Sequence, residues 1–344
     1  MAYDPDLDPR LDPRLKALLP LLTSIVEPTD AASREQMLAE AATPDALAAI
    51  EVMNLVTDSM DREEVVSSVG LRVMTETFTP PTGGPTLPLY IVRPDHDEVL
   101  PCVYYLHGGG MATMSCFQGN YRAWAKILAH HGLCVVMIDF RNAISPSRSV
   151  EVAPYPAGLD DCEAGLRYLH AEADRLGIDP TAITVAGESG GGNLTLSLAL
   201  RLKRMGELSL IAGLYALCPY LCGKYPDERY PSTTKNDGIF LSLHTNRTWL
   251  GYGAEAFEQG DPEAWPSFAT TAHVEGFPPT VISVNECDPL RDEGIAFYRL
   301  LLEAGVEARG RMVLGTIHAT ELIPVACPEI TASTAADLAA FAKR

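Results

Sequence analysis

The chain is short of basic residues. Its 344 positions hold 26 Lys and Arg against 45 Asp and Glu, which gives a formal net charge of −19 at pH 7. An acidic surface repels the phosphates of nucleic acids and of anionic membranes, so we expect neither as a partner. The same field disfavours strongly anionic substrates and is otherwise typical of a well-solvated surface.

Cysteine motifs that bind metals or exchange disulfides are also absent. No two cysteines form a C-x-x-C pair, and Cys218 and Cys222 lack a His or Cys partner at a metal-binding spacing. We therefore expect no metal, and we interpret the cysteines as reduced, buried, small apolar residues of a cytosolic protein. The eight cysteines are those at positions 102, 116, 134, 162, 218, 222, 287 and 327.

Long apolar runs are missing too. The longest uncharged stretch, 99–121, includes Pro101, three consecutive glycines and His107, which a membrane helix would not contain. The first residues are acidic and contain proline, so no secretory signal is predicted. We also expect no exposed apolar segment of the kind with which a lipase binds an emulsion. These absences favour a cytoplasmic protein that acts away from membranes.

What the chain does have is a regular alternation of strand-like and helix-like segments after a helical beginning. Apolar runs such as 133–138 are typical of a parallel sheet that is covered on both faces. The pattern predicts an α/β fold with a mostly parallel eight-stranded sheet between layers of helices. The predicted strands are 65–74, 87–92, 102–106, 133–138, 182–186, 210–217, 280–285 and 309–314. The helices predicted between and after them are 121–131, 158–176, 193–205, 293–304 and 330–342.

One segment interrupts this alternation. Residues 222–265 contain Tyr, Pro and Trp and show no clear strand pattern. We expect this segment to pack with the first helices as a cap over the sheet. The predicted division is 1–60 as N-terminal helices of the cap, 61–221 as core, 222–265 as a cap insertion and 266–344 as core.

The segment 187–191 (GESGG) follows an apolar strand and precedes a helical pattern. Glycines on both sides of Ser189 are typical of a nucleophile elbow, a strand-to-helix turn too tight for side chains beside the serine. The alternative is a chance glycine-rich turn. Glu188 either hydrogen-bonds the cap or a neighbouring loop, or it is a solvated residue with a structural role only.

The segment His107–Gly110 (HGGG) follows another strand and predicts the loop that completes an oxyanion hole. We expect the backbone N–H groups of Gly109, Gly110 and Gly190 to bind the oxyanion, with Gly108 allowing the turn. His107 is expected to hold the loop by hydrogen bonds, and the alternative is a ring packed in the core.

The acid and the base are expected in the chain order Ser, Asp, His. Asp288 follows the strand 280–285. Of its rivals, Glu286 lies too close to the strand end, and Asp292 lies at the start of a helix. His318 is the one histidine that follows Asp288 in the chain. A Ser189–His318–Asp288 triad would catalyse acyl transfer from esters.

Four segments together resemble the bacterial hormone-sensitive-lipase family of α/β-hydrolase carboxylesterases, in the branch that includes brefeldin A esterase. They are YLHGGG at 105–110, YPAGLDD at 155–161, GESGGGNL at 187–194 and DPLRDEG at 288–294. The resemblance, over 87–320, implies the same triad, a cap built from the N-terminus and 222–265, no cofactor and a preference for short-chain acyl esters.

Two positions depart from the family. Most members have Asp and Ala where this chain has Glu188 and Gly190, and a Gly-Phe pair follows the base where this chain has Ala319 and Thr320. The second change is expected to alter the base loop and the pocket wall. The predicted function is a serine carboxylesterase for a small-molecule ester, with a homodimer as one option. The alternatives are an amidase, carbamate or lactone hydrolase with the same triad, or a non-catalytic binding protein on this fold.

Overall fold

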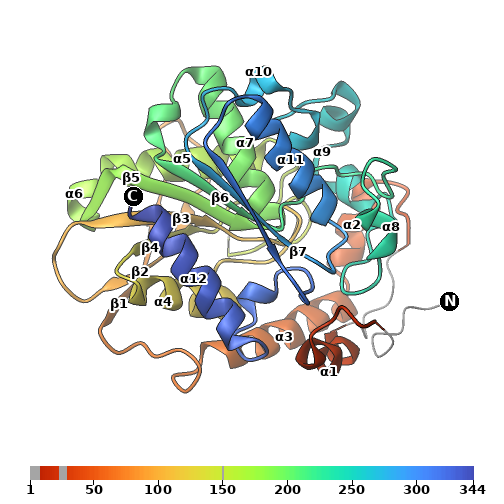
Figure 1. Cartoon of the computed structure of the whole chain (residues 1–344), viewed down its shortest axis with the longest axis horizontal. Helices are drawn as coiled ribbons and strands as arrows, with labels where there is room; N and C mark the ends of the chain where they lie inside the picture. Colours follow the sequence, from red (N-terminus) through yellow and green to blue (C-terminus); the bar gives the residue numbers. More distant parts are fainter. Residues whose placement is uncertain (1–7, 23–28, 149–150) are drawn as a thin grey trace.

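A single twisted sheet forms the centre of the molecule (Figure 1). The computed structural model describes residues 8–22, 29–148 and 151–344. The eight strands are ordered β1-β2-β4-β3-β5-β6-β7-β8; β2 pairs antiparallel with β1 and β4, and the other pairs are parallel. The predicted mostly parallel eight-stranded α/β fold is confirmed.

The strands are β1 (Leu71–Phe78), β2 (Leu87–Pro94), β3 (Leu100–Leu106), β4 (Cys134–Ile138), β5 (Ile178–Glu188), β6 (Gly213–Leu217), β7 (Thr280–Asn285) and β8 (Ala308–Val313). The α-helices are α1 (Pro13–Leu22), α2 (Arg34–Ala41), α3 (Pro44–Asp58), α4 (Gly119–His130), α5 (Ala157–Ala171), α6 (Ala173–Leu176), α7 (Gly190–Met205), α8 (Ser232–Lys235), α9 (Arg247–Gln259), α10 (Thr271–Val274), α11 (Arg291–Glu303) and α12 (Pro328–Ala342). Short 3₁₀ turns are η2 (Ser59–Asp61), η3 (Leu208–Leu210), η4 (Pro266–Phe268) and η5 (Thr320–Leu322).

Helices cover both faces of the sheet, which explains the near-continuous apolar strands. Along β3, Tyr104 packs into a core shared with α5, α7 and α11, whereas Tyr105 points to the opposite face and packs with α4 and α12. Because successive side chains of a strand point to opposite faces, a central strand between two helical layers must be apolar at every position. The carboxyl edge of this sheet is where the loops of the candidate site meet.

The first predicted strand was misplaced. The sequence pattern predicts a strand at 65–74, but β1 spans Leu71–Phe78. Val66 is buried in a turn, where it packs in a small cluster with Met60 and Ala123 rather than in a sheet. Its apolar character therefore reflects packing within this cluster. Over so few residues, an apolar pattern of this kind cannot be distinguished from that of a strand.

Segment 222–265 contains α8 and α9 and contacts the first part of the chain. The Asn246 side chain accepts a hydrogen bond from the Ala31 amide and donates one to the Ala31 carbonyl, each at 2.8 Å. Arg247 forms an ion pair with Glu40 at 2.7 Å. These contacts join two segments that lie far apart in the sequence.

Helix α3 contradicts the expectation that no apolar segment is exposed. Leu47 is 50% exposed and Leu55 is 72% exposed, and other apolar side chains of the same helix share this surface. Among the residues that the structure describes, no helix combines the length and the apolar character needed to cross a bilayer. All eight cysteines are free and buried, as expected.

Candidate active site

Ser189 lies in the turn that joins β5 to α7, at the carboxyl edge of the sheet. Its backbone has φ of 57° and ψ of −119°, a conformation that costs a non-glycine residue roughly 1–3 kcal/mol. A Cβ on Gly191 would lie 1.9 Å from the carbonyl oxygen of Leu106, and one on Gly187 would lie 2.5 Å from that of Gly191. Both glycines are therefore required, and the turn has the geometry expected of a nucleophile elbow.

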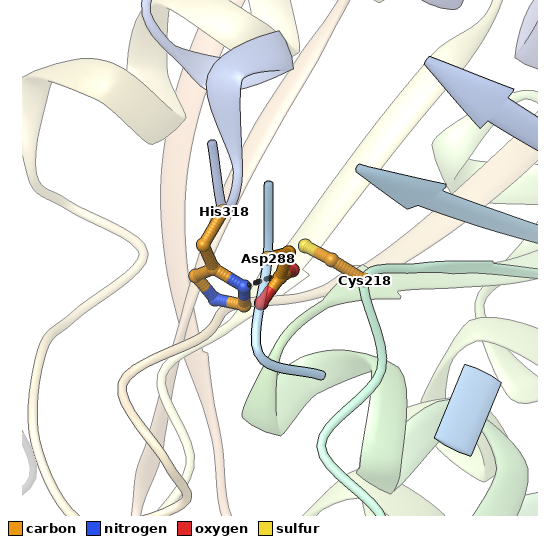
Figure 2. A group of neighbouring side chains, drawn as sticks. All are labelled: Cys218, Asp288 and His318. Atoms are coloured by element: carbon orange, nitrogen blue, oxygen red, sulfur yellow. Dashed lines mark hydrogen bonds and ion pairs between the residues drawn. The ribbon is translucent and has the colours of Figure 1, made fainter. Parts of the chain in front are cut away.

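Asp288 and His318 meet at the same edge of the sheet, on the loops that follow β7 and β8. His318 Nδ1 lies 2.7 Å from Asp288 Oδ2, and both side chains are buried (Figure 2). The Leu290 amide donates to the other carboxylate oxygen at 2.9 Å. Burial alone would lower the pKa of His318, but the Asp288 carboxylate outweighs it and holds the pKa well above its usual value.

The two rival carboxylates make other bonds. Glu286 accepts the backbone N–H of Gly315 at 2.8 Å, and Asp292 accepts that of Ser232 at 2.8 Å. These bonds hold neighbouring loops in place. Of the three acidic candidates, Asp288 is the one that the structure brings to the imidazole.

Cys218, which the sequence interpretation did not assign to the site, lies directly against the His–Asp pair. Its sulfur and the nearest polar atoms of Asp288 and His318 all lie within 4.8 Å of one another (Figure 2). These donors form a set that could hold a metal ion, but the hydrogen bond between His318 and Asp288 already uses two of them. Burial raises the pKa of the Cys218 thiol to about 11, so the neutral thiol persists. Its position at the end of β6 was the available signal.

Backbone hydrogen bonds place the serine turn beside this cluster. The Ser189 amide donates to Leu217 O at 2.9 Å, and the Tyr220 amide donates to Ser189 O at 3.0 Å. Ser189 is thus tied to the residues on both sides of Cys218. Within the described part of the chain, the Ser189 hydroxyl makes no hydrogen bond, and Ser189 as a residue is partly exposed. In enzymes without bound substrate, the hydrogen bond between a nucleophile and its base is often long or poorly aligned, and it tightens only when substrate binds.

The glycine loop after β3 lies against the start of α7, directly after Ser189. Gly109 and Gly110 have φ of 90° and 61°. A Cβ on Gly190 would lie 2.7 Å from the Gly110 amide nitrogen, so the start of α7 and the loop are in direct contact. Among the described residues, no hydrogen bond uses the Gly109 or Gly110 amide, and Gly190 begins a helix, where amides have no partner within the helix. The three expected oxyanion donors are therefore close together and unengaged.

His107 combines the two roles that the sequence left as alternatives, a hydrogen bond to the loop and a ring packed in the core. Its ring stacks on Phe140 with centroids 4.1 Å apart, and Nδ1 lies 2.9 Å from Gly108 O. Burial lowers its pKa, so the neutral imidazole donates to that carbonyl. It bonds and packs within the loop region, whereas the imidazole paired with Asp288 is that of His318.

The structure excludes one of the two interpretations of Glu188, that of a solvated residue. The side chain is 3% exposed and reaches the glycine loop, where it accepts the Gly108 amide at 2.7 Å. It also accepts the hydroxyls of Tyr105 and Tyr121, at 2.7 and 2.6 Å. Burial raises its pKa to about 7. The sequence offered no signal for these two tyrosines as its partners.

Known proteins resemble this chain in sequence and in fold. The profile of a family described as alpha/beta hydrolase fold matches residues 103–322. Carboxylesterase NlhH of Mycobacterium tuberculosis is 32% identical over 234 residues, which cover 66% of this chain and 70% of that protein. Ethyl acetate hydrolase of Pseudomonas putida is 29% identical over 242 residues, 68% of this chain and 71% of its own.

Solved structures are similar over nearly the whole chain. Esterase Est22, solved with p-nitrophenol, is 53% identical with a TM-score of 0.95, covering 98% of this chain and 99% of its own. Brefeldin A esterase, described as a bacterial homologue of human hormone-sensitive lipase, is 34% identical with a TM-score of 0.85. The match covers 99% of this chain and 95% of the chain of that esterase. The resemblance inferred from the four motifs is confirmed.

Proposed function

Because the chain belongs to the α/β-hydrolase fold family and is a carboxylic-ester hydrolase, we propose that it hydrolyses short-chain acyl esters through Ser189, His318 and Asp288. The observation that carries the proposal is the bond between His318 and Asp288 beside the strained Ser189 turn. A strained serine, an imidazole and a carboxylate at one sheet edge are the groups that acyl transfer needs.

The proposed reaction runs in two halves. Ser189 Oγ attacks the ester carbonyl while His318 Nε2 takes its proton. Asp288 holds Nδ1–H and stabilises the imidazolium that forms. The imidazolium then protonates the departing alcohol, and a water molecule repeats the sequence on the acyl-enzyme. The raised pKa of His318 agrees with this role, because the carboxylate favours the protonated ring.

We assign the tetrahedral oxyanion to the backbone N–H groups of Gly109, Gly110 and Gly190. Each donor of an oxyanion hole contributes about 10²–10³ to the rate in a serine hydrolase. The contact between Gly190 and the Gly110 amide supports this assignment, since it brings both segments to one point.

The cap is part of the same proposal. Residues 1–60 and 222–265 are assigned to it because Asn246 and Arg247 bond the first part of the chain.

The proposed reaction uses side chains and backbone groups of this chain together with water, and it requires no cofactor. The homodimer and the cytoplasmic location stay predictions from the sequence.

A panel of p-nitrophenyl esters with acyl chains of two to twelve carbons tests the proposal. The wild type is expected to prefer the short chains, and Ser189→Ala to lose activity by a factor on the order of 10⁶. Ser333→Ala, an exposed serine on α12, serves as the matched control and should keep wild-type kinetics. A Ser189→Ala enzyme with substantial activity would rule out the serine mechanism, and a maximum at long acyl chains would rule out the proposed substrate class.

A further inference from the structure

Glu188 occupies a place that the proposed mechanism does not use. It lies one residue before Ser189 at the end of β5, and its side chain bonds the glycine loop and two tyrosines. Both of its oxygens are engaged: Oε1 accepts from the Gly108 amide and the Tyr121 hydroxyl, and Oε2 accepts from the Tyr105 hydroxyl. Three donors from β3, the glycine loop and α4 therefore converge on one buried carboxylate.

The fit around this carboxylate is close. A Cβ on Gly108 would lie 2.3 Å from Glu188 Oε1, so only glycine allows the approach. Tyr105 and Tyr121 are buried, and burial together with the neighbouring Glu188 charge raises the pKa of each phenol well above its usual value. Both hydroxyls therefore keep their protons and remain donors.

The two segments that this carboxylate joins supply all the proposed oxyanion donors. Gly108 precedes Gly109 and Gly110, and Glu188 itself is two residues before Gly190. A displacement of about 1 Å at a reacting site costs on the order of 10² in rate. A rigid link between the two segments therefore has a direct consequence for catalysis.

We propose that Glu188 is a positioning residue for the oxyanion hole: with Tyr105 and Tyr121 it fixes the glycine loop against the nucleophile turn. The inference rests on the proposed function, because it assumes that Ser189 attacks and that the loop amides bind the oxyanion. Glu188 touches neither the substrate nor Ser189 Oγ in this account. Its effect passes through the Gly108 amide.

The chain supplies a matched control. Glu293 on α11 is a second buried carboxylate, and it also accepts backbone amides, those of Leu221 and Cys222, and a tyrosine hydroxyl, that of Tyr225. Its pKa is likewise raised by burial, to about 8. It makes no hydrogen bond to the glycine loop, although its charge interacts with that of Asp288. Ketone binding, which depends on the oxyanion donors, is therefore the readout that separates its loss from the loss of Glu188.

The test compares Glu188→Ala, Glu188→Gln, Tyr121→Phe and Glu293→Gln at pH 8 with p-nitrophenyl butyrate. For each variant, kcat, KM and thermal unfolding are measured, together with the inhibition constant of an aryl trifluoromethyl ketone, whose adduct with serine needs the oxyanion donors. We expect Glu188→Ala to lower kcat about 10² with little change in KM. The inhibition constant should rise by a similar factor.

Glu188→Gln keeps the shape and one acceptor, and Tyr121→Phe removes one donor, so both should fall between Glu188→Ala and the wild type. Glu293→Gln should lose stability without a parallel loss in ketone binding. If the Glu188→Ala chain does not fold, the two milder variants decide the question.

The outcomes separate the two proposals. Losses in kcat and ketone binding that run in parallel across the Glu188 and Tyr121 variants support the positioning role. Reduced stability with unchanged kcat and ketone binding would overturn that role and leave the serine mechanism intact. An active Ser189→Ala enzyme would overturn both.

Discussion

The two halves of the site use the same chemical group for different tasks. In the acid–base half, the Asp288 carboxylate bonds the ring of His318. In the oxyanion half, the Glu188 carboxylate bonds the Gly108 amide and two tyrosine hydroxyls. In the proposed mechanism, one carboxylate changes the proton affinity of a reacting group, whereas the other fixes a segment of backbone. The task of a buried carboxylate is set by the donors that face it, and the difference predicts unequal effects of mutation.

Of the two carboxylates, Asp288 beside the proposed base should have the larger effect. Asp288→Asn is expected to lower kcat by roughly 10⁴, because the amide favours the wrong tautomer of the imidazole. Loss of the negative charge also lowers the pKa of His318, and the base is active when neutral. The acidic limb of the kcat/KM profile should therefore move to lower pH.

Asp292→Asn provides the control, since that carboxylate bonds Ser232 and not the imidazole. Its pH profile should match the wild type. A shift of the Asp288→Asn limb to higher pH would contradict the assignment of the acid.

An intermediate effect should arise at the close contact in the oxyanion half. Gly108→Ala places a Cβ against Glu188 Oε1 and is expected to lower kcat on the order of 10². In a Glu188→Ala background the clash with the side chain is removed, so the two losses should not multiply. Kinetics of the two single variants and the double variant measure this coupling. Fully multiplicative losses would show that the two residues act independently.

A smaller effect concerns stability and pH. The pKa of Glu188 is raised by burial to about 7, from an ordinary value of 4.5. A carboxyl group of this kind stabilises the fold most below pH 4.5, and its contribution is lost as pH rises through 7. The free energy of unfolding of the wild type, minus that of Glu188→Gln, should therefore decrease from pH 4.5 to 7. Urea unfolding across this range is the measurement, and a difference that increases with pH would contradict the account.

The smallest effect should lie outside the site, on the exposed face of α3. Leu55 is 72% exposed, so Leu55→Gln should change the free energy of unfolding by no more than about 0.5 kcal/mol. Leu196 is fully buried in α7, and Leu196→Ala should cost about 2–5 kcal/mol. Urea unfolding of both variants measures the contrast, and a large loss for Leu55→Gln would mean that this face is covered in solution.

The two halves also differ in how far the sequence predicted them. Chain order was enough to select His318, because one histidine follows the acidic candidates. Asp288 was chosen over Glu286 and Asp292 by its position between the strand end and the helix start. The layered α/β fold followed from apolar strands, since burial on both faces leaves a continuous pattern. The partners of Glu188 could not be predicted: Tyr105 and Tyr121 lie 83 and 67 residues away in the chain. Contacts between side chains so distant in sequence depend on the strand order, which local patterns do not contain.

Cys218 and α3 were missed for related reasons. Cys218 reaches the His–Asp pair because β6 and β7 are neighbours in the sheet, and their order is a tertiary property. The apolar residues of α3 have the composition of a buried helix, yet its outer face is uncovered in the folded chain. Composition reports what a helix could bury, and the surrounding chain decides what it does bury.

Covalent labelling tests the central claim most directly. A fluorophosphonate is incubated with the wild type and with Ser189→Ala, and the labelled residue is located by mass spectrometry of peptides. The account predicts one adduct per chain, on Ser189, and none in the variant. An adduct on another residue, or a wild type that hydrolyses esters while Ser189 stays unlabelled, would contradict it.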